Sequence, residues 1–246
     1  MVIDLNCDMG EGIGHDEQLM PFISSANIAS GFHAGNYSVM NDTVKLAKKF
    51  NVAVGAHPSF PDKENYGRTN MNLTVKEIYE LMLYQMGSLH AIAKVNSVTM
   101  HHVKPHGALY NMAAVNMEYA DAIVDAIIDF DSTLILYGLA NSKMIDSAKA
   151  KGIKYFAEAF ADRTYQADGT LTSRSQPNAL IDSEDVATKQ VLQMINQKSV
   201  KATNGAIIQL QADTICLHGD GQRALSFAKA LNHSLNESGI KISFLR

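Results

Sequence analysis

Short apolar runs alternate along the chain with longer segments in which apolar residues recur every three to four positions. The short runs predict strands at 2–6, 27–30, 52–56, 98–103, 134–137, 155–159 and 214–217. Most of these runs are continuously apolar, which is typical of parallel strands that are buried on both faces. Residues 240–244 are a candidate eighth strand, and the strand-like run 206–210 has no assigned place in this pattern.

The longer segments predict helices at 39–50, 74–95, 117–130, 142–151, 183–195 and 221–236. Thr74 and Glu77 have the spacing of a capping box, and Gly152 and Gly239 stand where left-handed residues end helices. Repeated strand–helix units with right-handed crossovers build either a barrel or a doubly wound sheet. Seven or eight such units around one core favour an irregular α/β barrel, and we expect residues 1–246 to form a single domain.

Ionisable residues follow six of the predicted strands. They are Asp8 and Glu11, then His33, His57, Lys104 and His106, Glu158 with Asp162 and Arg163, and finally His218 and Asp220. A single histidine or aspartate in such a place is more commonly a hydrogen-bonded or helix-capping residue than a catalytic one. Because the carboxyl ends of parallel strands meet at one face, however, we expect these side chains to converge on an active site. Loops as long as 58–73 and 163–182 are also commonly functional.

The segment that follows the first strand is rich in glycine and raises the question of nucleotide binding. Gly10, Gly12 and Gly14 give G-x-G-x-G, whereas the dinucleotide fingerprint is G-x-G-x-x-G, and no Walker sequence occurs in the chain. Asp8 and Glu11 would repel a phosphate. Backbone amides at a helix start near residue 16 could still bind an anion, but the glycines favour a tight turn.

Metal binding is a second possibility for the same residues. Asp8, His33, His57 and His106 are suitable donors for a divalent ion, although their spacing forms no local motif such as H-E-x-x-H. Lys104 lies beside His106 in sequence, and a cation near a metal ion is unfavourable. The remaining histidines favour structural roles, and one of the adjacent pair at 101–102 is expected to point into the barrel.

Composition excludes several classes of partner. The net charge is −4 in 246 residues and the basic residues are scattered, so no nucleic-acid or membrane-surface partner is expected. The two cysteines, Cys7 and Cys216, are too few for a disulfide framework and indicate a reduced, cytoplasmic protein. We expect Cys216 to lie in the core and Cys7 to face away from Asp8. No signal segment or membrane-spanning run is evident.

Six motifs in the same order along nearly the whole chain resemble the LamB/YcsF family, the group of 5-oxoprolinase A subunits. They are DLNCDMGEG, IASGFHAGN, GAHPSFPD with YGR, HVKPHGALYN, FADRTYQADGTLTSR and TICLHGDG. The resemblance implies an irregular seven-stranded β/α barrel of the glycoside hydrolase and deacetylase type. It also implies ATP-dependent opening of 5-oxoproline (pyroglutamate) to L-glutamate, together with partner subunits B and C. Ser30, Asn36 and Thr69 depart from the family's common residues, and Ser30 argues against a catalytic thiol there.

Residue chemistry suggests roles for a lactam hydrolase. The candidate catalytic residues are Asp8, His57, Lys104, His106 and Glu158, with Asp8 or His106 as the base and Lys104 and His57 stabilising developing charge. Arg163 or Arg174 would hold the substrate carboxylate. The full candidate binding set is Glu11, His33, Arg68, Asp162, Arg163, Arg174, His218 and Asp220. ATP, as its magnesium complex, would bind to this barrel or to a partner.

Two other functions are compatible with the sequence. The first is a metal-dependent deacetylase acting on a carbohydrate or another amide, for which the aspartate and histidine donors are suitable. The second is a non-catalytic scaffold or binding subunit in an ATP-driven complex. The number of ionisable residues expected at one face argues against the scaffold, because a scaffold has no need of them.

Overall fold

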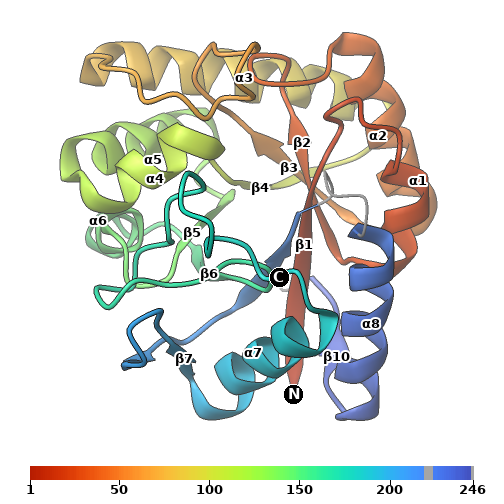
Figure 1. Ribbon diagram of the computed structural model, residues 1–246. Helices are drawn as coiled ribbons and strands as arrows, with labels where there is room; N and C mark the ends of the chain where they lie inside the picture. The colour runs from red at the N-terminus through yellow and green to blue at the C-terminus, as the bar shows by residue number, and fades with distance from the viewer. Residues whose placement is uncertain (219–223, 245–246) are drawn as a thin grey trace.

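Parallel strands close into a seven-stranded barrel in the computed structural model, which describes residues 1–218 and 224–244 (Figure 1). The strands are β1 (Val2–Met9), β2 (Ser25–Ala29), β3 (Ala53–His57), β4 (Met100–Val103), β5 (Ile135–Leu139), β6 (Tyr155–Phe160) and β9 (Thr214–Leu217). They pair in that order, and β9 closes the ring against β1. The prediction of an irregular seven-stranded β/α barrel is therefore confirmed.

The first strand shows how the sequence separates two environments. Along β1 the polar residues Asp4, Asn6 and Asp8 alternate with apolar residues, and the latter pack in the hydrophobic core. Side chains alternate between the two faces of a strand, so the polar set points into the barrel. The expectation of continuously apolar strands is wrong here, and β1 continues to Met9. Asp8 consequently lies within the strand rather than after it.

Helices cover the outside of the barrel (Figure 1). They are α1 (Asp16–Leu19), η1 (Met20–Phe22), α2 (Tyr37–Phe50), α3 (Val75–Val95), α4 (Gly107–Val115), α5 (Met117–Asp131), α6 (Lys143–Lys151), α7 (Glu184–Gln197) and α8 (Ala224–Glu237). The predicted capping box at Thr74 is present: its hydroxyl accepts from the amide of Glu77, whose carboxylate accepts from Thr74 in return. None of the described helices is both long and apolar enough to cross a membrane.

Three local features were missed or left open by the sequence prediction. Helix α4 was not expected, because its segment lacks a polar face and therefore shows no helical periodicity. The run 206–210 contains β8 (Ile207–Gln209), which pairs antiparallel with β7 (Ser199–Lys201) outside the barrel. The candidate eighth strand is β10 (Lys241–Ile242), which pairs with Val2 and Ile3 beside the closed ring. The predicted helix start at 221 lies outside the described residues.

Candidate active site

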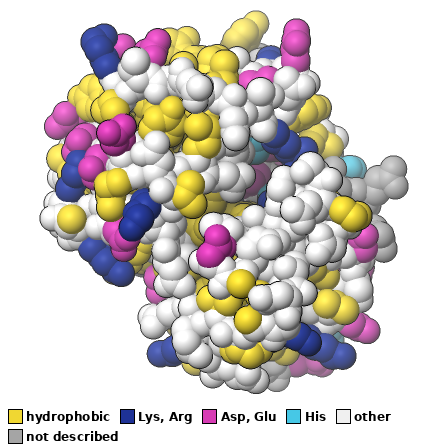
Figure 2. Space-filling view, turned by 60° about the vertical axis from the view of Figure 1, so that its left-hand side comes forward, with side chains coloured by type: hydrophobic (Ala, Val, Ile, Leu, Met, Phe, Trp, Pro, Cys, Tyr) yellow, Lys and Arg dark blue, Asp and Glu magenta, His cyan; other side chains and the backbone are white. Residues whose placement is uncertain are grey.

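A cavity of about 650 Å³ opens at the carboxyl-terminal ends of the barrel strands. Its lining comes from segments far apart in sequence, including Asp8, His57, Lys104, His106, Arg163, Arg174 and His218. Figure 2 shows a hollow in this face, in which basic, acidic and histidine side chains lie close together. The structure therefore brings together most of the residues that were expected to converge.

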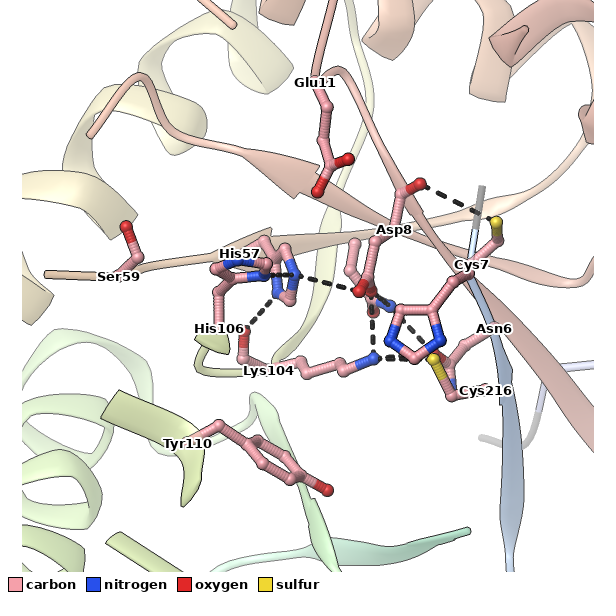
Figure 3. Close-up of polar contacts among 12 residues, drawn as sticks. Asn6, Cys7, Asp8, Glu11, His57, Ser59, Lys104, His106, Tyr110 and Cys216 are labelled. Carbon is pink, nitrogen blue, oxygen red and sulfur yellow. Dashed lines mark hydrogen bonds and ion pairs between the residues drawn. The ribbon is translucent and has the colours of Figure 1, made fainter. Parts of the chain in front are cut away.

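A buried lysine lies at the centre of this end of the barrel (Figure 3). Lys104 directly follows β4, and its Nζ lies 2.9 Å from Oδ1 of Asp8 and 2.9 Å from Oε1 of Glu158. It also donates to Oδ1 of Asn6 at 3.2 Å and to Sγ of Cys216 at 3.0 Å. Lys104 is only 2% exposed, so these contacts replace nearly all of its hydration. One cation thus connects β1, β6 and β9 across the barrel.

The network fixes the protonation of its members. Burial would lower the pKa of Lys104, but Asp8, Cys216 and Glu158 outweigh burial and hold that pKa well above its ordinary value. Burial would raise the pKa of Asp8, but His57 and Lys104 hold it well below its ordinary value. Lys104 is therefore a cation and Asp8 an anion at neutral pH.

The two cysteines occupy different surroundings. Cys7 packs in the hydrophobic core on the face of β1 opposite to Asp8, as expected. Cys216 also lies in the core, as expected, and its sulfur accepts a hydrogen bond from Lys104. Burial raises the pKa of both thiols well above the ordinary value, which leaves them uncharged at neutral pH.

Two polar residues that the sequence analysis did not select hold Glu158. The hydroxyl of Tyr110 donates to Oε2 at 2.7 Å, and Nδ2 of Asn6 donates to Oε1 at 2.9 Å. Tyr110 comes from the unexpected helix α4, so no pattern in the sequence placed it here. Asn6 does carry a signal, since it stands two residues before Asp8 and therefore on the same face of the strand.

Asn27, which the sequence analysis did not select, supports Asp8 and lies against His102. Nδ2 of Asn27 donates to Oδ1 of Asp8 at 2.8 Å, and Oδ1 of Asn27 lies 2.8 Å from Nε2 of His102. His102 is fully buried and stacks on the ring of Tyr137, with centroids 4.0 Å apart. It is the histidine of the 101–102 pair that points into the barrel. A Cβ on Gly55 would lie 2.1 Å from its Nε2, so only glycine leaves room for this ring.

Three histidines and Glu11 form a cluster beside Asp8. Nε2 of His57 lies 2.8 Å from Nδ1 of His106 and 3.3 Å from Oδ2 of Asp8. The ring of His33 stacks on that of His106 with centroids 3.9 Å apart, and its Nε2 lies 3.8 Å from Oε1 of Glu11. Burial and the neighbouring His57 lower the pKa of His33 to about 3. Burial and the neighbouring rings of His33 and His57 likewise lower the pKa of His106 well below its ordinary value.

A glycine in the YGR motif makes room for this cluster. Gly67 has a positive φ of 66°, and a Cβ on it would lie 2.9 Å from Cβ of His33 and 3.0 Å from Cδ2 of His106. Its carbonyl accepts from the amide of Ala108 at 2.8 Å, which ties the loop 58–73 to the start of α4. The loop thus packs directly against two of the histidines.

Arg163 and His218 also line the cavity, and Asp162 lies behind the ring of His218. Arg163 is buried and donates to the carbonyls of Thr172 and Ala179, so its guanidinium holds its own loop rather than pointing freely into the cavity. Nδ1 of His218 lies 2.7 Å from Oδ2 of Asp162. Burial would raise the pKa of Asp162, but His218, Arg174 and Arg163 hold it below its ordinary value.

Arg68 and Arg174 also line the cavity, in keeping with their selection as candidate binding residues. Asp220, the last of the candidate binding residues, lies outside the described part of the chain.

The fold and the cavity define a β/α-barrel protein with a polar, enzyme-like site at the carboxyl ends of its strands. The LamB/YcsF family model matches residues 3–246, and the chain belongs to this family. A relative from Tolumonas auensis, named as the A subunit of 5-oxoprolinase, is 54% identical over 245 residues, covering 98% of each chain.

Solved structures agree with this assignment. The lactam utilization protein from Thermus thermophilus has a TM-score of 0.93 and 39% identity, with both chains fully covered. A family 4 carbohydrate esterase from Streptomyces lividans has a TM-score of 0.56 at 11% identity, covering all of this chain and 93% of the other. The esterase shares the fold alone, which supports the predicted deacetylase type of barrel.

Proposed function

We propose that this chain carries the hydrolytic site of an ATP-dependent 5-oxoprolinase. The enzyme would convert 5-oxoproline, ATP and water into L-glutamate, ADP and phosphate. The names of the 54%-identical relative and of the Thermus structure support a role in lactam chemistry. The observation that carries the proposal is the buried Asp8–Lys104–Glu158 network beside the cavity, because a scaffold has no use for such costly buried charges.

The cavity fits the proposed substrate. Its volume of about 650 Å³ exceeds what a small five-membered lactam needs, so a phosphate donor can share it. Arg68 and Arg174 line it, and a guanidinium binds a carboxylate through two parallel hydrogen bonds. We assign the carboxylate of 5-oxoproline to these two residues, since Arg163 is engaged by its own loop.

The chemistry follows from the charges. A lactam carbonyl is a poor electrophile, and transfer of a phosphoryl group from ATP to its oxygen creates a carbon that water attacks. Lys104 remains a cation and stabilises negative charge that develops on the substrate. Oδ1 of Asp8 is occupied by Lys104 and Asn27, which leaves Oδ2 to accept the proton of the attacking water. Oδ2 also lies 3.3 Å from Nε2 of His57.

The proposed enzyme needs more than this chain. No Walker sequence occurs here, so we propose that the magnesium complex of ATP is bound with the help of partner subunits B and C in the cytoplasm. The relative's name designates one subunit of an enzyme, which supports the existence of partners.

Reconstitution tests the proposal. The chain is mixed with subunits B and C of a relative, 5-oxoproline and ATP, and glutamate and ADP are measured together. We expect equal amounts of both products, and neither without this chain. Coupled release by subunits B and C alone would favour the scaffold, whereas glutamate release without ADP would exclude the ATP-dependent reaction. Titrating the isolated chain with ATP, and then repeating the titration with the partners, locates the nucleotide.

A further inference from the structure

The hydrogen bonds in the cluster of His33, His57, His106 and Glu11 locate the protons on the histidine rings. Nδ1 of His57 lies 2.7 Å from the carbonyl oxygen of Lys104, and Nε2 of His106 lies 2.9 Å from that of Tyr66. A carbonyl oxygen only accepts, so both of these ring nitrogens carry a proton. In neutral rings the opposite nitrogens, Nε2 of His57 and Nδ1 of His106, then carry lone pairs.

The third histidine has the same arrangement. The hydroxyl of Ser59 donates to the carbonyl of Phe60, so its oxygen accepts from Nδ1 of His33 at 2.9 Å. Nε2 of His33 therefore carries a lone pair as well. This atom is fully buried and has no hydrogen-bond partner among the described residues. A buried polar atom without a partner is rare and calls for a specific explanation.

These lone pairs conflict unless something positive lies among them. Nε2 of His57 and Nδ1 of His106 lie 2.8 Å apart, and in neutral rings neither atom carries the proton that a hydrogen bond between them requires. One ring nitrogen from each of the three histidines and a carboxylate oxygen of Glu11 all lie within 4.8 Å of one another. A cation placed among them would resolve both the contact and the unpartnered nitrogen.

We propose that His33, His57, His106 and Glu11 bind one divalent transition-metal ion. Metal-binding histidines usually donate their second ring N–H to a carbonyl or a similar acceptor, and all three histidines here do so. Three imidazoles with one carboxylate suit Zn²⁺, Co²⁺, Mn²⁺ or Fe²⁺ better than Mg²⁺ or Ca²⁺, which prefer oxygen. The 2.8 Å separation agrees with two adjacent ligands at about 90° around an ion roughly 2.0 Å from each nitrogen.

One adjustment accompanies binding. His33 and His106 stack with an interplanar angle of 10°, and an ion lies near the plane of each ring that binds it. The ring of His33 must therefore tilt toward Glu11, whose Oε1 is 3.8 Å away. The ion would lie beside Asp8 in the wall of the cavity. This assignment is distinct from the magnesium that accompanies ATP, and it does not depend on the identity of the lactam.

Cobalt titration of the isolated, chelator-treated chain tests the proposal. Co²⁺ is the probe, because its visible absorption reports nitrogen ligands, and Zn²⁺ is the competitor. We expect one Co²⁺ per chain, displaced by Zn²⁺, with affinity at least about 100-fold weaker in His33→Gln and Glu11→Gln. Ser59→Ala removes the acceptor behind His33, together with the hydrogen bond from Ser59 to the carbonyl of Phe60, and should weaken binding about 10- to 100-fold.

The matched control is His233→Gln on α8, because this histidine is exposed and, within the described part of the chain, pairs with Glu237 on its own helix. It should bind Co²⁺ like the wild type, and circular dichroism of the metal-free proteins verifies that each variant folds. Equal binding by His33→Gln and the wild type would overturn the proposal. So would the absence of saturable binding, with ¹⁵N shifts showing that His57 and His106 share a proton instead. No ATP, lactam or partner subunit is present, so either failure leaves the proposed function standing.

Discussion

Replacement of Lys104 by methionine is the sharpest test of the buried charge network. The side chain keeps its length and apolar stem but loses the ammonium group that contacts Asp8 and Glu158 at 2.9 Å each. Both carboxylates are almost fully buried, so their charges would be left without a cation. Removing one partner of a buried ion pair typically costs about 3–5 kcal/mol of unfolding free energy. For a chain of this size, that lowers the midpoint of thermal unfolding by roughly 6–20 °C.

The chain provides a matched control in Lys151. Its Nζ also contacts two carboxylates, Asp125 at 2.6 Å and Asp121 at 3.4 Å, but on the surface, where its side chain is 27% exposed. Surface ion pairs contribute only about 0–1 kcal/mol, so Lys151→Met should change the midpoint little. Urea unfolding followed by circular dichroism compares both variants with the wild type. If Lys104→Met costs no more than Lys151→Met, this network does not stabilise the barrel.

The pH dependence of the stability lost in Lys104→Met provides an independent check that Lys104 lowers the pKa of Asp8. Burial by itself raises the pKa of Asp8, and Lys104 is one of the groups that offset this effect. Without the lysine the folded-state pKa of Asp8 should rise. An acid whose pKa is higher in the folded than in the unfolded protein destabilises the fold fully above its folded-state pKa. It has no effect on stability below its unfolded-state pKa. The deficit of Lys104→Met should therefore shrink as the pH falls toward about 4.

Three further predictions, the first with a matched control, have defined outcomes. Gly55→Ala would place a Cβ 2.1 Å from the buried ring of His102 and should cost at least about 1–3 kcal/mol of unfolding free energy, measured in urea. The control is Gly87→Ala in α3, where a Cβ would meet no atom within 4 Å; it should stabilise the protein by about 0.5–1 kcal/mol. Thr74→Ala removes the capping hydroxyl of α3 and should cost about 1 kcal/mol in the same assay. Asp162 has a lowered pKa in the folded protein, so its contribution to stability is present above about pH 4 and is lost as the pH falls below that value. The difference in unfolding free energy between the wild type and Asp162→Asn should therefore shrink as the pH falls through that range. A constant difference would contradict the assignment.

The barrel was predictable because its strands and most of its helices carry strong local patterns. The failures have physical causes. Helix α4 has no polar face, and the pairing of β8 with β7 depends on contacts that lie outside the repeating strand–helix pattern. The extension of β1 through Asp8 was missed because strand ends are set by pairing, here with β2 as far as Met9.

The candidate site was predictable as a set of charged residues but not as a geometry. Strand order alone brings Asp8, Lys104 and Glu158 to one end of the barrel. The neutral members of the network, such as Asn27 and Tyr110, carry no charge signal and are recognised only from their hydrogen bonds. The engagement of Arg163 by its own loop likewise depends on a long loop whose path the sequence does not define.

The role of Asp8 is tested most directly by the turnover of Asp8→Asn in the reconstituted enzyme. Asparagine keeps the shape of the side chain but cannot accept the proton of water. Asp125→Asn, which changes an exposed acid of α5, is the matched control. We expect a loss of glutamate release of about 10²–10⁴-fold for Asp8→Asn at unchanged folding, and near-normal release for Asp125→Asn. Glutamate release by Asp8→Asn at the wild-type rate, still coupled to ADP, would contradict the assignment of Asp8 as the base.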